Sequence, residues 1–153
     1  MSSKTIVELS ETERRNIEMA CAALCVDYCE IVDAKEYERL RQIFAEGARY
    51  FSPAAPDKLL QGVDAIIVYL SHIPATLVTQ HLACNIRIAA DSADSSSGSC
   101  RILLFTADGN ATETNEGRKA AEKKRIGVYY DRYIRTPSGW RIAERRGHTL
   151  LHT

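Results

Sequence analysis

The sequence predicts an α+β fold in which a mostly antiparallel sheet follows a group of helices. Helical spacing of apolar residues dominates the chain up to about residue 73, and strand-like alternation dominates from residue 79 onward. Helices that precede a run of hairpin-linked strands are typical of α+β domains and not of alternating βαβ units. The 153 residues contain no linker and no internal repeat. We therefore expect one domain over residues 1–153.

Three helices are expected in the first half of the chain. The capping box Ser10–Glu13 opens the first helix, whose apolar residues from Ile17 to Val32 share one face. A second helix has its inner apolar residues between Tyr37 and Phe44, and Gly47 is its predicted C-terminal stop. A third, short helix runs from residue 62 to residue 73.

The predicted strands fill the rest of the chain. Residues 48–52 read as a short strand that is interrupted by Pro53 and Pro56. The turn at residues 136–139, Thr-Pro-Ser-Gly, is a hairpin signal between two alternating segments. Four longer strands are predicted over residues 79–89, 99–107, 125–135 and 140–151.

Composition and charge exclude several classes of protein. Twenty basic residues balance twenty acidic ones at a pI near 6.9, which argues against a protein whose main partner is nucleic acid or an anionic membrane. No apolar run approaches the roughly 18–20 residues that span a bilayer. The N-terminus lacks the apolar core of a secretory signal, and the five cysteines form an odd number that fits reduced thiols. We expect a cytoplasmic protein.

Cysteine and histidine spacings could indicate a metal, but a structural role explains them better. Cys21, Cys25 and Cys29 recur every four residues along the first helix, and buried cysteine behaves as a small hydrophobic residue. There is no CxxC pair and no histidine nearby in the sequence. His148 and His152 lie on a predicted strand or at its frayed end, where a spacing of four does not converge on an ion. We predict no metal site.

Several segments, in order, resemble a known family. These are YCEIVDAKEYERLRQIFAEGARYF, GVDAI, TQHLACN and GVYYDRYIRTPSGWRIAERR, which together extend from about Ile17 to His148. The set resembles the SnoaL-like branch of the nuclear transport factor 2-like superfamily. The resemblance implies a cone-like, curved, mostly antiparallel sheet wrapped around three helices and enclosing an apolar pocket. It also implies a homodimer formed through the outer face of the sheet.

The resemblance also points to candidate site residues. Asp33 and His81 fall at the positions of the catalytic aspartate and histidine of scytalone dehydratase. Tyr28, five residues before Asp33, matches a tyrosine of bile acid 7α-dehydratase, which shares the equivalent of His81. This chain departs from both enzymes. The segment 101–107 lacks the second histidine of scytalone dehydratase, and Thr149 lies near the position of an arginine in the bile-acid enzyme.

The residues by themselves leave other interpretations of this pair open. The pattern Asp33-Ala34-Lys35-Glu36 is itself a capping motif for the second helix. Strict alternation places His81 on the face opposite the apolar residues at positions 82, 84, 86 and 88. His81 reaches a pocket only if that second face lines the pocket near the start of the strand, which a bulge in a curved sheet permits.

Four further residues are predicted to bind a ligand at the pocket, namely Tyr50, Asn85, Tyr129 and Arg145. Asp131 shares the face of Tyr129, and an ordinary cross-strand ion pair with Arg145 or Arg146 explains it best. The basic residues Arg118, Lys119, Lys123, Lys124 and Arg125 could form an anion-binding patch. A solvated loop and strand edge is the favoured interpretation, because such runs are more often solvated and no aromatic residues interleave them as nucleic-acid stacking would need.

The functional hypothesis is a cofactor-free lyase or isomerase, similar to a dehydratase, that acts on a small hydrophobic molecule such as a polyketide or steroid. His81 would transfer the proton, because imidazole titrates near neutral pH. Asp33 would orient the ring, and Tyr28 would hydrogen-bond an oxygen on which negative charge develops. The alternative is a non-catalytic small-molecule-binding or accessory domain, since this fold hosts both.

Overall fold

The computed structural model of the chain describes residues 8–153. Residues 1–7 lie outside the described residues, and they include part of the N-terminal segment in which we predict no secretory signal. None of the described helices is long and apolar enough to cross a bilayer. The elements follow one another as α1 (Glu11–Ala34), η1 (Tyr37–Gln42), β1 (Phe44–Ser52), β2 (Ala55–Gln61), α2 (Val63–Ser71), β3 (Leu77–Ala90), β4 (Ser95–Asp108), β5 (Arg125–Thr136) and β6 (Gly139–His152).

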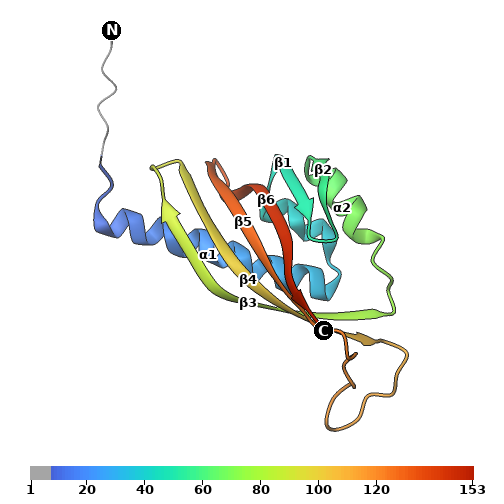
Figure 1. Cartoon of the computed structure of the whole chain (residues 1–153). Coiled ribbons are helices and arrows are strands. Elements are labelled where there is room, and N and C mark those ends of the chain that lie inside the picture. Colours follow the sequence, from blue (N-terminus) through green and yellow to red (C-terminus); the bar gives the residue numbers. More distant parts are fainter. Residues whose placement is uncertain (1–7) are drawn as a thin grey trace.

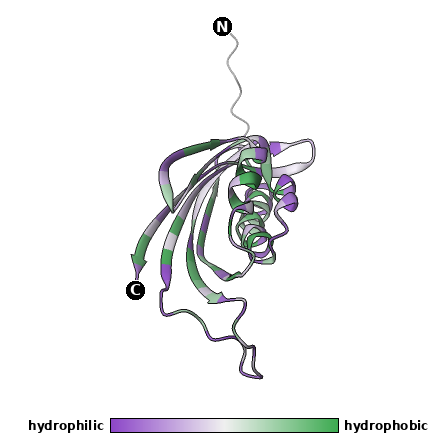
Figure 2. Cartoon of the chain, turned by 90° about the vertical axis from the view of Figure 1, so that its right-hand side faces the viewer, coloured by the Kyte–Doolittle hydropathy of each residue, from purple (hydrophilic) through white to green (hydrophobic). Residues whose placement is uncertain are grey.

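The strands form one curved sheet with the order β2-β1-β6-β5-β4-β3. Neighbouring strands are antiparallel, except that β1 and β6 run parallel. Helix α1 crosses the concave face of the sheet, and α2 lies beside β1 and β2 (Figure 1). Seen from the side, the helices and the sheet form two layers, with the sheet curling around the helices (Figure 2). The predicted α+β cone is confirmed.

Helix α1 begins and packs as its sequence predicts. The Ser10 side chain accepts a hydrogen bond from the backbone N–H of Glu13, and the Glu13 carboxylate accepts one from the backbone N–H of Ser10. This capping box satisfies donors that a helix start otherwise leaves free. The apolar face is buried against the sheet through residues Ile17, Cys21, Leu24, Cys25, Tyr28, Cys29, Ile31 and Val32.

The predicted second helix is wrong in length and in type. The segment Tyr37–Gln42 is a short 3₁₀ helix, and Phe44 already begins β1, so that Gly47 lies inside a strand. Asp33 belongs to the last turn of α1 and does not cap the second helix. The left-handed backbone of Lys35, with φ of 57°, ends α1 two residues later. The chain therefore turns after Asp33, and the carboxylate is free for other partners.

Strand β2 was not predicted, because Pro56 reads as a strand breaker. In the structure β2 lies at the edge of the sheet and pairs only with β1. Proline has no N–H to donate, and an edge strand needs no donor on its outer side. The missing hydrogen bond is therefore tolerated at this position, and an edge strand follows where the sequence suggested a loop.

A bulge in β3 decides which face His81 occupies. The pairing of β3 with β4 shifts register between Cys84 and Arg87, and Asn85 has a positive φ of 49°. Before the bulge, the odd-numbered residues face the helices, and Leu82 is 54% exposed on the outer face. After the bulge, the even-numbered residues Ile86 and Ile88 pack on the core. Strict alternation, which the sequence suggested for the whole strand, holds only on each side of Asn85.

We predict that the left-handed conformation of Asn85 makes this position sensitive to β-branched residues. Asn85→Val is expected to lower the free energy of unfolding by about 1–3 kcal/mol, because a branched side chain is strained at positive φ. Asn85→Gly removes the side chain without strain and should change stability by less than about 1 kcal/mol. Urea unfolding followed by far-UV circular dichroism measures both. Equal stabilities for the two variants would contradict the prediction.

Candidate functional site

A cavity of about 520 Å³ lies between the helices and the concave face of the sheet. Most of the surface of its wall is apolar, and its polar groups come from hydroxyl, histidine and cationic side chains. A mostly apolar wall with few polar groups is typical of small-molecule sites. The residues that line the cavity are Tyr28, Val32, Tyr50, Ser52, Pro53, Ala54, Tyr69, Leu70, His72, Ile73, Leu77, Thr79, His81, Ile102, Leu104, Thr106, Lys123, Arg125, Gly127, Val128, Tyr129 and Thr149.

His81 lies in the cavity wall and is held by Asp33 from behind. Nδ1 of His81 is 2.5 Å from Oδ1 of Asp33, and the backbone N–H of His81 donates to Oδ2 at 2.7 Å. The Thr79 hydroxyl donates to Oδ1 at 2.8 Å. The Asp33 carboxylate therefore accepts bonds at both oxygens and fixes the ring through Nδ1. This leaves Nε2 as the ring nitrogen that is available to a ligand.

Tyrosine hydroxyls supply the polar groups at another part of the wall. Oη of Tyr28 and Oη of Tyr50 are 2.8 Å apart, and the ring of Tyr129 meets that of Tyr28 edge-on at a centroid distance of 5.5 Å. Burial raises the pKa of each of these three tyrosines above its usual value. They are therefore neutral at neutral pH. Since one hydroxyl of the Tyr28–Tyr50 pair donates to the other, the accepting hydroxyl keeps its own proton to donate to a ligand.

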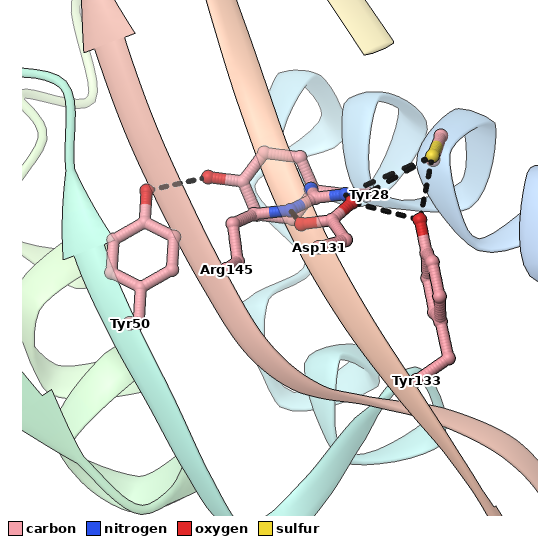
Figure 3. Close-up of polar contacts among 6 residues, drawn as sticks. Tyr28, Tyr50, Asp131, Tyr133 and Arg145 are labelled. Atoms are coloured by element: carbon pink, nitrogen blue, oxygen red, sulfur yellow. Dashed lines mark hydrogen bonds and ion pairs between the residues drawn. The ribbon is translucent and has the colours of Figure 1, made fainter. Parts of the chain in front are cut away.

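A fully buried ion pair lies beneath the tyrosines. Arg145 donates from Nε and Nη2 to the two carboxylate oxygens of Asp131 at 2.8 Å and 2.6 Å, and neither side chain is exposed (Figure 3). Tyr133 donates to Oδ2 of the same carboxylate at 2.9 Å. The guanidinium carbon lies 4.4 Å from the ring centroids of both Tyr28 and Tyr129. The predicted ion pair is present, but it is part of the core and not of the surface.

One group of possible metal ligands occurs within residues 8–153. Cys25, Cys100 and Asp131 bring one ligand atom each within 4.8 Å of the others. These residues do not suit a cation, because both oxygens of Asp131 are already bound by Arg145, whose positive charge would repel an ion. Cys29 lies on α1, as Cys25 does, and burial raises the pKa of its thiol to about 12. Its thiol is therefore neutral and packs as a small apolar side chain.

Of the seven predicted site residues, four line the cavity and three do not. Tyr28, Tyr50, Tyr129 and His81 line the cavity, and the other residues take three different places. Asp33 lies behind His81, and Arg145 lies beneath the tyrosine rings, outside the wall. Asn85 does not reach the cavity. It is exposed at the bulge of β3, where the strand changes faces.

Several lining residues were missed by the sequence reasoning. Thr79 shares the face of His81 by strand alternation, and this signal was available in the sequence. Lys123 and Arg125 belong to the basic cluster interpreted above as a solvated loop and strand edge, with an anion patch as the alternative; both are exposed, and both also line the cavity. The clustering of basic residues was visible in the sequence, but its place at the cavity follows from the pairing of Arg125 in β5 with Leu104 in β4.

Comparison with known proteins identifies the relationship of the chain. The model of the SnoaL-like domain family matches residues 13–146. A scytalone dehydratase-like protein from Novosphingobium aromaticivorans shares 22% identity and a TM-score of 0.75, over 93% of this chain and 90% of that protein. The hexachlorocyclohexane dehydrochlorinase LinA type 2 shares 20% identity and a TM-score of 0.76, over 94% and 92% of the two chains.

A third similar structure is a dehydratase-like protein of the NTF2-like family from Streptomyces avermitilis. It shares 14% identity and a TM-score of 0.74, over 90% of this chain and 99% of that protein. No curated protein matches the sequence. At these identities the likenesses to solved structures show a common fold.

We predict that the buried ion pair is costly to break. Arg145→Leu leaves the Asp131 carboxylate buried without its cation, and it should lower the free energy of unfolding by about 3–5 kcal/mol. The neighbouring Arg146 offers a matched control, because its side chain is 43% exposed where it pairs with Glu144. Arg146→Leu should cost about 1 kcal/mol or less. Urea unfolding compares the two variants, and similar losses would show that the pair does not stabilise the core.

Proposed function

Because the chain belongs to the SnoaL-like domain family, we propose that it is a cofactor-free lyase or isomerase acting on a small hydrophobic molecule. The observation that carries the proposal is the contact of Nδ1 of His81 with Asp33 at 2.5 Å, in the wall of an apolar cavity. A histidine held by a carboxylate through one nitrogen presents the other as a base. An apolar surrounding strengthens the electrostatic interactions within it.

The proposed step is a proton transfer next to a carbonyl group. Nε2 of His81 takes a proton from the carbon, and the electron pair of the C–H bond moves toward the carbonyl oxygen. The Asp33 carboxylate stabilises the imidazolium that forms. In a dehydration, the electron pair then forms a carbon–carbon double bond while the C–O bond breaks, and the hydroxyl leaves as water with the proton from His81.

The tyrosine hydroxyls are suited to the oxygen that becomes negative. Tyr28 and Tyr50 are neutral donors that form one hydrogen-bonded pair in the cavity wall. A hydrogen bond aimed at developing negative charge in a water-poor site contributes strongly to catalysis. Arg145 lies against the ring of Tyr28 and holds it in place, so we assign it a positioning role.

One observation favours a rival function, that of a non-catalytic binding domain. Strand β4 presents Ile102, Leu104 and Thr106 to the cavity. The second histidine that the resemblance to scytalone dehydratase implies on this strand is therefore replaced by apolar or hydroxyl side chains. A pocket that only binds its ligand needs no histidine on this strand; the second histidine of the cavity wall, His72, comes instead from the end of α2.

We predict that substitution of His81 or Asp33 lowers the turnover number, kcat, and leaves ligand affinity nearly unchanged. Ring-bearing β-hydroxy ketones are offered as substrates, and the absorbance of the conjugated enone product is followed. His81→Gln should lower kcat by about 10²- to 10⁴-fold, and Asp33→Asn should also lower it, because an amide cannot accept all the bonds that Asp33 accepts.

The controls separate the two functions. Cys84→Ser lies on the same strand but is exposed on the outer face, and it should leave kcat unchanged. Ligand affinity, measured by calorimetry, should change little in His81→Gln. Tight binding by the wild-type protein without turnover of any compound in the panel would support the binding domain and reject the lyase.

We further propose a homodimer that forms through the outer face of the sheet. Leu82, Leu103, Ile126 and Leu151 pair in register across the four strands β3, β4, β5 and β6, so they form one row on that face. Leu82, Ile126 and Leu151 are 54%, 37% and 64% exposed. A continuous apolar row on a sheet face suits a self-complementary interface between two copies.

The mass in solution tests the dimer. Light scattering should give twice the 17.1 kDa of one chain. Ile126→Asp places a charge in the row and should yield monomers. Val68→Asp, at an exposed position of α2, should remain dimeric. A wild-type monomer at micromolar concentration would reject the interface.

A further inference from the structure

Cationic side chains line one part of the cavity without acidic partners. Lys123 and Arg125 are both exposed and both belong to the cavity wall. Within residues 8–153, neither of them takes part in an ion pair. The lining residues of the described chain include no aspartate and no glutamate. The cavity therefore has positive charges on its wall that the wall itself does not neutralise.

Strand register places Arg125 in line with the candidate base. His81 pairs with Leu104 across β3 and β4, and Leu104 pairs with Arg125 across β4 and β5. Directly paired residues of an antiparallel sheet point to the same face. Two strand spacings separate the Cα atoms of His81 and Arg125 by about 10 Å. The base and the cation therefore stand at the two ends of one row, with Leu104 between them.

The adjoining row leaves room for a ligand body. Ala83, Ile102 and Gly127 are paired in register across the same three strands. The two end residues of this row, Ala83 and Gly127, have a methyl group and no side chain, respectively. Ile102 and Gly127 line the cavity. An apolar ring can thus lie over the sheet between the tyrosines and the row that contains His81 and Arg125.

We propose that the ligand of this cavity is a hydrophobic ring compound that carries a carboxylate. Its carboxylate binds Lys123 and Arg125, and its ring body extends toward His81 and the tyrosines. A guanidinium matches a carboxylate with two parallel N–H donors, and an ammonium adds a point charge. This inference rests on the proposed function for the cavity itself, and it adds the charge and the orientation of the substrate.

A pair of probes with the same shape tests the charge. Naphthoate and acetylnaphthalene carry a carboxylate and a neutral methyl ketone on the same ring system. Each is titrated against the neutral fluorescent dye phenylnaphthylamine bound to the protein. The double variant Lys123→Gln with Arg125→Gln should lower the affinity for naphthoate by about fivefold to tenfold, as expected for solvent-accessible ion pairs. Its affinity for acetylnaphthalene should stay within about twofold of the wild-type value. Raising the salt concentration should weaken naphthoate alone.

A matched control removes the same net charge from the same segment. Lys119→Gln with Lys124→Gln changes residues outside the cavity wall and should alter neither probe. An equal loss of naphthoate affinity in this control would overturn the proposal, because the effect would then come from net charge. An equal loss of affinity for acetylnaphthalene in the Lys123 and Arg125 variant would also overturn it, since the two side chains would then contribute through steric contact and not through their charge.

A cavity-filling variant separates this inference from the proposed function. Leu104→Trp fills the centre of the row and should abolish binding of the dye and of both probes, with the far-UV circular dichroism spectrum unchanged. Dye binding that Leu104→Trp does not affect would place the dye outside the cavity and reject both proposals. The remaining outcome is that Leu104→Trp abolishes dye binding while the Lys123 and Arg125 substitutions leave naphthoate affinity unchanged. That outcome would reject only the proposed carboxylate of the ligand.

Discussion

The buried ion pair between Asp131 and Arg145 is the interaction on which the rest of the site depends. It joins β5 to β6 with two hydrogen bonds, and its guanidinium lies against Tyr28 of α1 and Tyr129 of β5. Removing one partner of such a pair leaves an uncompensated charge in the core, and the contact of the same guanidinium with the ring of Tyr28 links these two strands to α1. The tyrosine rings that form one wall of the cavity are held between this charge and the cavity space.

The cavity then divides into parts with different chemistry. The tyrosines supply neutral donors, and β3 supplies His81 with Asp33 behind it. Strand β5 supplies Arg125 on the same face, in register with His81 through β4. A ligand bound among these groups would meet hydrogen-bond donors, an imidazole and a positive charge from separate elements of one sheet and one helix. This arrangement requires only that the strands keep their register, which the long antiparallel pairings of β3 to β6 secure.

Much of the fold could be predicted from the sequence. The capping box at Ser10, the apolar face of α1 and the hairpin turn before β6 are local patterns, and the structure contains each of them. The second helix was overestimated, because the apolar residues near Phe44 fit helical spacing as well as the start of a strand. Strand β2 was missed, because the tolerance of Pro56 depends on its being at an edge, and the edge exists only once the whole sheet has formed.

For the candidate site, the sequence by itself determined the residue types and the strand or helix on which most of them lie. The pairing of Asp33 with His81 was suggested by the resemblance and not by any local pattern, which favoured a helix cap. Only the tertiary structure decided which face His81 occupies, because the bulge at Asn85 arises from the pairing of β3 with β4. Only the tertiary structure placed Arg145 under the tyrosines and brought Lys123 and Arg125 to the cavity. Periodicity reports the faces of one element, whereas burial and cavity contacts depend on which elements pack together.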